Sequence, residues 1–151
     1  MTAATRLLGV DFGRVRVGLA VSDPDRRLAS PLATYHRRDD EQDAEFFRAL
    51  VAEEQIGAIV VGLPVHLDGT EGQKAAEARA FGRRLGEATG LPVTYYDERF
   101  TTVEAEAALW DAGLTHKRRK ARRDRVAAQI LLQAYLDAGC PEEPAAGPLD
   151  G

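Results

Sequence analysis

The stretch from Leu7 to Ser22 sets one acid between two apolar segments, and it constrains the fold of this chain more than any other stretch. The first apolar segment ends at Asp11, and Gly13 then permits a sharp turn. From 15 to 21, apolar residues alternate with other types, which predicts an antiparallel strand with one buried face. A buried carboxylate is costly unless it has hydrogen-bond donors or a cation. Asp11 is therefore either a turn residue that caps its own backbone or part of a functional site.

The rest of the chain predicts helices that alternate with strands. The order indicates an α/β fold with a five-stranded mixed sheet, in which three antiparallel strands precede the parallel strands and helices lie on both faces. In the first half we expect an edge-like strand at Leu28–Tyr35, a helix from Asp40 to Glu54 stopped by Gly57, and a strand at Ala58–Leu63. In the second half we expect a helix from the capping box Thr70/Gln73 to about Ala88 with its stop at Gly90, a strand at Leu91–Asp97, a helix from Thr101 through Trp110 that closes at Gly113, and a helix at Arg122–Ala138.

Two more acids occupy positions that favour a functional interpretation. Glu98 follows directly on the last predicted strand, and ligands bind at the carboxyl ends of parallel strands. Its alternative role is that of a first-turn glutamate that complements a helix dipole. Asp124 precedes Leu131 by two helical turns, so its side chain lies on the flank of the face that packs on the sheet. Its alternative role is an ion pair with a neighbouring arginine.

The charge of the chain is segregated. Overall it is −4, but residues 116–125 (HKRRKARRDR) carry seven Lys or Arg against one acid, or +6, which leaves 13 basic against 23 acidic residues, or −10, elsewhere. A basic patch on an acidic protein is typical of polyanion binding, and a solvated, flexible charge run is the alternative.

Size and composition limit the class of protein. The 151 residues suit one domain, which we expect at residues 1–139, followed by a disordered Pro- and Glu-rich tail at residues 140–151. One cysteine excludes an internal disulfide, and three scattered histidines offer no zinc-site spacing. Since no membrane span or signal peptide is apparent, we expect a cytoplasmic protein.

Four stretches of the chain together resemble one known family. They are GVDFGRVRVGLAVSD, IVVGLPVHLDGTEG, DERFTTVEAE, and a basic run that leads into DRVAAQILLQAYL. In this order they resemble the YqgF family, also called RuvX, of Holliday junction resolvases and pre-ribosomal RNA nucleases, which has the RNase H-like fold. The resemblance covers about residues 7–138. Asp11, Glu98 and Asp124 stand where that family has its acids, and an Arg-rich stretch replaces its usual Lys/Arg mixture before Asp124.

The three acids suit a metal-dependent nuclease by their chemistry as well. Grouped carboxylates repel one another unless a cation neutralises them, and oxygen ligands at an open site suit Mg²⁺ or Mn²⁺. We expect a two-metal site in which Asp11 bridges both ions while Glu98 and Asp124 each anchor one. The residues expected to bind backbone phosphates are Arg14, Arg16, Lys117, Arg118, Arg119 and Lys120.

Phosphate contacts carry no sequence information, so we expect recognition of substrate by shape. The resemblance implies structured RNA at the 5′ end of the small-subunit ribosomal RNA precursor, in pre-ribosomal particles, or branched DNA at a Holliday junction. No segment marks a dimer interface, which favours a monomer or a weak dimer.

Two other classes of protein remain as alternatives. An actin-like or sugar-kinase ATPase also begins with a strand, Asp-x-Gly and a returning strand, but it needs two such domains, and this chain has room for one. A non-catalytic RNA-binding ribosome-assembly factor would use the basic segment and not the acids.

Overall fold

The structure, a computed structural model, describes residues 5–100 and 116–141, apart from the side chains of residues 100 and 116–121. The helix expected from Thr101 to Gly113 and most of the expected tail lie outside this part. No helix in the described part combines the length and apolar composition that a membrane crossing requires. In chain order the elements are β1 (Arg6–Asp11), β2 (Arg16–Ser22), β3 (Ala29–His36), α1 (Asp40–Glu53), β4 (Ile56–Leu63), α2 (Gln73–Thr89), β5 (Val93–Asp97), the short 3₁₀ helix η1 (Glu98–Phe100) and α4 (His116–Asp137).

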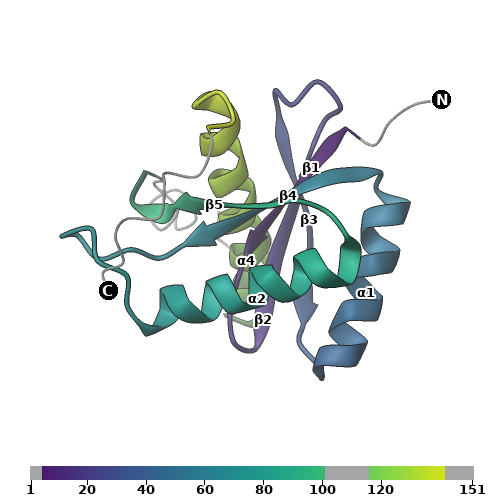
Figure 1. Cartoon of the computed structure of the whole chain (residues 1–151), viewed down its shortest axis with the longest axis horizontal. Helices are drawn as coiled ribbons and strands as arrows, with labels where there is room; N and C mark the ends of the chain where they lie inside the picture. The colour runs from purple at the N-terminus through teal and green to yellow at the C-terminus, as the bar shows by residue number, and fades with distance from the viewer. Residues whose placement is uncertain (1–4, 101–115, 142–151) are drawn as a thin grey trace.

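The five strands form one mixed sheet in the order β3-β2-β1-β4-β5 (Figure 1). β1 pairs antiparallel with β2, and β2 pairs antiparallel with β3. β4 runs parallel to both β1 and β5, its neighbours. The predicted fold is confirmed, with β3 at an edge of the sheet. Because β1, β4 and β5 are parallel, their carboxyl ends, which include Asp11 and Asp97, meet at the same edge.

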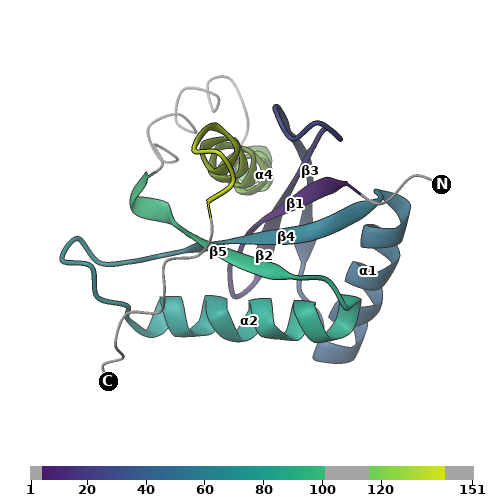
Figure 2. The same ribbon diagram turned by 45° about the horizontal axis from the view of Figure 1, so that its top comes forward.

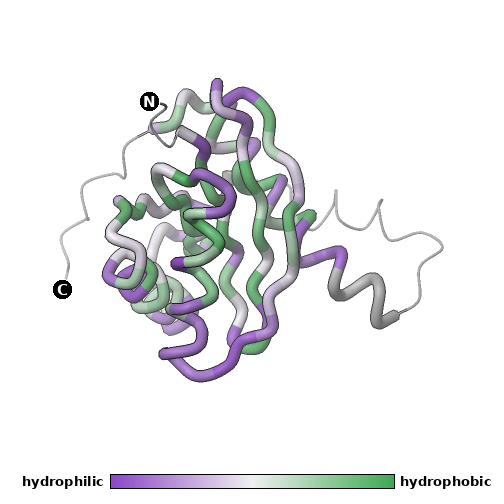
Figure 3. Tube along the Cα trace, turned by 90° about the vertical axis from the view of Figure 1, so that its right-hand side faces the viewer, coloured by the Kyte–Doolittle hydropathy of each residue, from purple (hydrophilic) through white to green (hydrophobic). Residues whose placement is uncertain are grey.

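Helices cover both faces of the sheet, as predicted. Figure 2 shows α1 and α2 on one face and α4 on the other. Under α1 and α2 lies an aromatic-rich core in which the rings of Phe47 and Phe81 are 5.8 Å apart. Under α4 the buried residues include several alanines together with Leu132 and Tyr135, and Cys140 packs against them. Figure 3 shows hydrophobic residues along the strands of the sheet.

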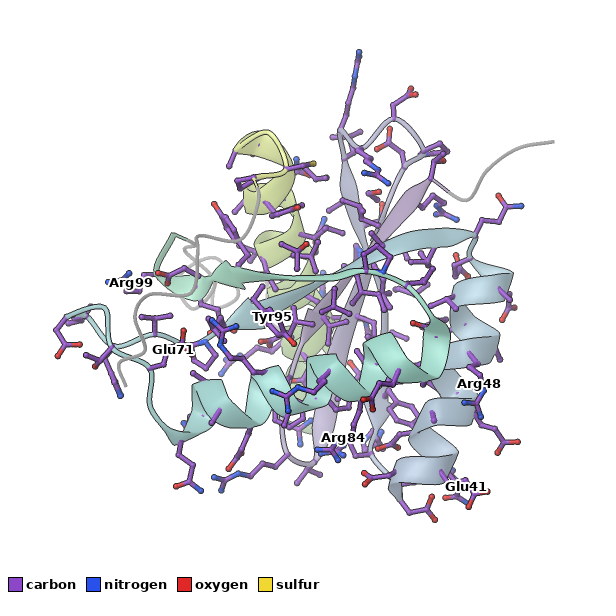
Figure 4. The ribbon with its side chains drawn as sticks, in the orientation of Figure 1. Glu41, Arg48, Glu71, Arg84, Tyr95 and Arg99 are labelled. Carbon is purple, nitrogen blue, oxygen red and sulfur yellow. The ribbon has the colours of Figure 1, made fainter. Side chains whose placement is uncertain are left out.

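β5 is held to α2 by Tyr95, whose side chain points from the strand toward the helix (Figure 4). Its hydroxyl donates a hydrogen bond of 2.9 Å to the carbonyl oxygen of Arg79, and the guanidinium of Arg79 lies 4.9 Å from the ring centroid. A Cβ at Gly82 would lie 2.5 Å from the Tyr95 hydroxyl, so the glycine makes room for the ring. These contacts hold β5 in place, and Glu98 directly follows this strand.

β2 departs from the sequence prediction, because both of its faces are buried. Every residue from Val17 to Ser22 is buried, since α4 covers the face that we expected to meet solvent. The approach is so close that a Cβ at Gly18 would collide with the carbonyl oxygen of Asp124. The residues that alternate with the large apolar side chains of β2 are Gly18, Ala20 and Ser22. They are small enough to pack under a helix, so they are buried as well.

α1 ends earlier than predicted. The helix runs to Glu53, and Gln55 then adopts a positive φ of 56°, the left-handed conformation that turns the chain. Gly57, the predicted stop, lies inside β4. A side chain usually disfavours this conformation, so the sequence pointed to the nearest glycine instead.

α2 begins later than predicted, and the expected capping box is absent. Its N-cap is Gly72, which has no side chain to cap the helix. Thr70 instead donates its backbone N–H and its hydroxyl to a carboxylate oxygen of Asp68, at 2.9 and 2.7 Å. The predicted stop at Gly90 is confirmed, with a left-handed φ of 74°.

α4 is longer than predicted, because it begins at His116 instead of Arg122. The basic run therefore lies within the helix. Its helical spacing distributes the charges around the axis instead of aligning them on one face.

Asp43 in α1 is a buried carboxylate, with a side chain only 6% exposed. It accepts hydrogen bonds from the Tyr35 hydroxyl at 2.7 Å, the Arg38 backbone N–H at 2.9 Å and the Arg37 Nε at 3.2 Å. Burial alone would raise the pKa of Asp43, but these three donors outweigh it and hold the pKa below its ordinary value. Burial and the bond to Asp43 raise the pKa of Tyr35 to about 12. We call these four residues the Asp43 network.

Candidate active site

Asp11 and Glu98 meet at the edge of the sheet where the parallel strands end. Asp11 is the last residue of β1, and Glu98 opens η1 directly after β5. β4 lies between these strands, and its Gly62 leaves room for the contact, since a Cβ there would lie 2.7 Å from Glu98 Oε1. The two carboxyl groups share a hydrogen bond. Glu98 thus does more than complement a helix dipole.

The electrostatics of this pair favour a proton or a cation between the two groups. Burial, and then the charge of Glu98 and the hydrogen bond with it, raise the pKa of Asp11 well above its ordinary value. Burial also raises the pKa of Glu98, and the charge of Asp97 adds to the effect. Two carboxylates in contact cannot both be ionised cheaply, so they hold a proton unless a metal ion replaces it.

Asp124, the third acid of the site, comes from the helix layer opposite α1 and α2. It lies in α4, and its Oδ2 accepts a hydrogen bond of 2.6 Å from the Nε of Arg16, at the start of β2. This ion pair joins α4 to β2. The charge of Asp124 also raises the pKa of Asp11, so the two groups sense one another. The flank position predicted from helical spacing is confirmed.

These residues line one cavity of about 570 Å³. Its walls come from the turn between β1 and β2, from Pro64 after β4, from the first turns of α2, and from α4. The described lining residues are Asp11, Phe12, Gly13, Arg14, Val15, Arg16, Pro64, Lys74, Glu77, Ala78, Glu98 and Asp124. A second cavity, of about 480 Å³, lies between the ends of α1 and α2 and contains no acid among its described lining residues.

Two charged residues that line the cavity, Lys74 and Glu77, were not predicted from the sequence. Both lie in the first turns of α2, and the charge of Lys74 lowers the pKa of Glu98, partly offsetting the effect of burial. Glu77 binds the guanidinium of Arg14 through two hydrogen bonds of 2.8 and 2.9 Å. Their one signal was a position just after the loop GLPVHLDGTEG, which belongs to the family resemblance.

The predicted phosphate-binding residues fall into two groups. Arg14 and Arg16 line the cavity, but each is bound to a carboxylate, Glu77 and Asp124 respectively. The other four, Lys117, Arg118, Arg119 and Lys120, lie in the first turns of α4, and their side chains fall outside the described part.

The donor set suits a hard divalent cation, because it consists of carboxylate oxygens in an open, water-accessible cavity. The contact between Asp11 and Glu98 supports this fit, since a cation would replace the proton that the pair otherwise holds. Asp124 is not part of a ready-made cluster. Within residues 5–100 and 116–141, no three side chains of Asp, Glu, His or Cys are grouped so as to hold one metal ion.

A second set of ion pairs lies beside the site, where Figure 4 shows Arg99 and Glu71 at the same end of the molecule. The guanidinium of Arg99 binds the Asp97 carboxylate, with Nη2 to Oδ2 at 2.6 Å. Glu71 binds Arg79 in the same manner through two bonds of 2.8 Å. Asp97 is thus paired with Arg99, although its charge still raises the pKa of Glu98.

Known proteins are similar to this chain over most of its length. The sequence profile of the RuvX family, described as Holliday junction resolvase, matches residues 5–138. The chain belongs to the RuvX family. A Rhodopirellula baltica protein named "Putative pre-16S rRNA nuclease" is 49% identical over 136 residues, which are 90% of this chain and 79% of that protein. An Anaeromyxobacter protein with the same name is 44% identical over 132 residues, 87% of this chain and 96% of the relative.

Solved structures show that this RuvX chain shares its fold with junction-cutting enzymes. Thermus thermophilus RuvC in complex with a Holliday junction has a TM-score of 0.59 at 16% identity, covering 91% of this chain and 98% of RuvC. Fowlpox virus resolvase, in complex with Holliday junction DNA, has a TM-score of 0.53 at 10% identity, covering 90% of this chain and 99% of the resolvase. These TM-scores show that the fold is RNase H-like. At such low sequence identity, a shared fold does not identify the substrate.

Proposed function

We propose that this protein is a metal-dependent nuclease that hydrolyses phosphodiester bonds of structured nucleic acid in the cytoplasm, with the 5′ end of pre-16S ribosomal RNA as its substrate. The observation that carries the proposal is the contact of Asp11 with Glu98 at the carboxyl edge of the sheet. Two carboxylates in contact destabilise a fold unless a proton or a cation neutralises them, and such a site is kept for its function. Carboxylates at an open cavity are suited to bind Mg²⁺ or Mn²⁺.

The three acids act together in this proposal. Asp11, at the centre of the site, would hold divalent cations together with Glu98 and Asp124. Bound ions supply an activated water and stabilise the leaving 3′ oxygen in an in-line displacement at phosphorus. The sheet and α4 contribute by holding the three carboxylates on rigid elements, so that little reorganisation is needed during the reaction.

The basic residues position the substrate. Lys74 lies at the mouth of the cavity, exposed and close enough to influence Glu98, so it would hold a phosphate next to the acids. The basic first turns of α4 carry Lys117 to Lys120 and would extend this contact along the nucleic-acid backbone. Phosphate contacts of this kind recognise the shape of a folded RNA, which supports a structured substrate.

The names of the relatives favour ribosomal RNA as the substrate, since several relatives at 42–49% identity carry the pre-16S rRNA nuclease name. The family description and the RuvC complex favour branched DNA as the second candidate. A non-catalytic assembly factor is a third candidate, because a basic helix alone suffices for binding.

One assay separates these candidates. A labelled pre-16S RNA fragment that retains its 5′ precursor sequence and a labelled four-way DNA junction are incubated with wild type, Asp11→Asn and Asp25→Asn, each with Mg²⁺, Mn²⁺ or EDTA. Asp25 is exposed in the turn after β2, so Asp25→Asn is a matched control for the chemical change. We expect wild type and Asp25→Asn to cut the RNA with either metal, and Asp11→Asn to bind it without cutting.

The other results are equally informative. Cutting of the junction but not of the RNA would assign the resolvase function. Binding by wild type without cutting, in every metal condition, would contradict the nuclease and favour the assembly factor.

A further inference from the structure

Arg16 forms an ion pair with Asp124, one of the three carboxylates proposed to hold the metal. Its Nε lies 2.6 Å from Asp124 Oδ2, and the two side chains are only 31% and 21% exposed. An ion pair that is partly shielded from water is stronger than a surface pair. Both residues line the cavity that contains Asp11 and Glu98. Asp124 is therefore already paired with a positive charge in the free protein.

Arg14 shows that this pairing is not a general property of the arginines in the cavity. It lies two residues away in the chain and lines the same cavity, but its guanidinium binds Glu77 in α2. Its side chain is 66% exposed, about twice the exposure of Arg16. Of these two arginines, Arg16 alone is bound to one of the three acids at the centre of the site.

The backbones around the Arg16–Asp124 pair are held in place. Gly18, two residues after Arg16, packs so closely under α4 that a Cβ would collide with the carbonyl oxygen of Asp124. β2 is paired on both sides, with β1 and with β3. If Asp124 exchanges one partner for another, only side chains can move, because the backbones of β2 and α4 are held in place. A long arginine side chain can make this exchange without moving the helix.

We infer that Arg16 withholds Asp124 from the metal until a backbone phosphate of the substrate binds Arg16, so that nucleic acid and metal bind cooperatively. The inference rests on the proposed metal-dependent nuclease function. A guanidinium binds a phosphate through two parallel hydrogen bonds as well as it binds a carboxylate. When the phosphate takes Arg16, Asp124 loses its counter-ion and gains affinity for a divalent cation. The substrate would thereby complete the metal site.

Such coupling is reciprocal. If RNA increases the affinity for metal by some factor, then metal increases the affinity for RNA by the same factor. Coupling between two sites is typically about 5- to 150-fold. The effect would also weaken metal binding whenever no phosphate backbone is bound to Arg16.

The test measures binding and does not depend on cleavage. Mn²⁺ binding to the free wild type, Arg16→Gln and Arg14→Gln is measured by isothermal titration calorimetry, with thermal unfolding to confirm that each variant is folded. We expect Arg16→Gln to bind Mn²⁺ about fivefold or more tightly than wild type, because the competitor of the metal has been removed. Arg14→Gln removes the same charge from the same cavity, and we expect its Mn²⁺ affinity to change less than about twofold.

A second measurement tests the coupling itself. The affinity for a fluorescent RNA hairpin is measured by anisotropy, with and without Mn²⁺, and a gel confirms that the hairpin stays intact. In wild type we expect Mn²⁺ to tighten RNA binding about fivefold or more, and in Arg16→Gln we expect the two affinities to agree within about twofold. Asp124→Asn removes the pair from its other side, so it should lose the coupling without gaining Mn²⁺ affinity.

The outcomes separate the inference from the function on which it rests. Equal or weaker Mn²⁺ binding by a folded Arg16→Gln would overturn the inference and leave the nuclease intact. Failure of wild type to bind Mn²⁺, both with and without RNA, would contradict the metal-dependent function itself.

Discussion

Two clusters in this protein contain carboxylates shielded from water, and they differ in how those carboxylates are satisfied. In the Asp43 network, one carboxylate accepts hydrogen bonds from three donors, and its pKa lies below the ordinary value. In the candidate active site, Asp11 shares a hydrogen bond with a second carboxylate, and its pKa lies well above the ordinary value. The first cluster is complete, whereas the second needs a proton or a cation.

The difference teaches how to tell a structural acid from a functional one. A buried acid that stabilises a fold is surrounded by donors, because an unsatisfied buried charge is costly. An acid that contacts another acid at an open cavity raises the free energy of the empty protein, and such sites are kept for their function. Substitutions in the two clusters should therefore have opposite effects on stability and activity.

Glu98→Gln should have the largest effect, and it should fall on activity. Glutamine keeps the shape and the hydrogen bond but removes the charge that holds a metal ion, so we expect cleavage to fall by roughly 10³-fold. The free energy of unfolding in EDTA should stay equal or rise, because the repulsion with Asp11 is removed. Single-turnover cleavage and urea unfolding measure the two effects, and a clear loss of stability would contradict the comparison.

Asp43→Asn should show the opposite pattern. The amide cannot accept all three hydrogen bonds, and the partly buried guanidinium of Arg37 loses one of its two carboxylate partners and keeps only the longer contact with Asp40. We therefore expect the free energy of unfolding to fall by about 2–4 kcal/mol. Arg37 also lies 5.4 Å above the ring of Phe12, next to Asp11. Cleavage per folded molecule should nevertheless stay within about twofold of wild type at a temperature where the variant is folded. Urea unfolding and cleavage assays measure the two quantities, and a large loss of activity would show that the clusters are coupled.

The pH dependence of stability should reveal the Asp43 network with a smaller effect. Because the pKa of Asp43 is lowered in the folded state, its stabilising contribution is complete above the pKa of the unfolded chain and is lost as the pH falls through the folded value. The difference in unfolding free energy between wild type and Asp43→Asn should therefore shrink from about pH 6 to about pH 3. Urea unfolding at several pH values measures this, and a constant difference would assign the stabilisation to packing.

The sequence was sufficient to predict the fold and the position of each acid relative to its own element. Asp11 ends an apolar strand, Glu98 follows a strand, and helical spacing places Asp124 on the flank of its helix. Each of these statements depends on local periodicity within a few residues, and a chain with four stretches in family order has few folds open to it.

Helix boundaries were predicted less well, for a local reason. Glycine and threonine are frequent at caps, so the pattern pointed to Gly57 and Thr70. In the structure Gln55 takes the left-handed turn and Gly72 begins α2, because the positions of β4 and of the loop before α2 decide where the chain must turn.

The partners of the acids were decided by the tertiary structure alone. Arg16 and Asp124 are 108 residues apart in the chain, and no periodicity links them. Their contact exists because α4 packs directly over Gly18 of β2, and this crossing also buries the second face of the strand. The sequence by itself determined which residues carry charge and on which side of each element they lie. Only the packing of helix on sheet decided which charges meet, since a side chain reaches a few ångströms and the chain must first be brought within that distance.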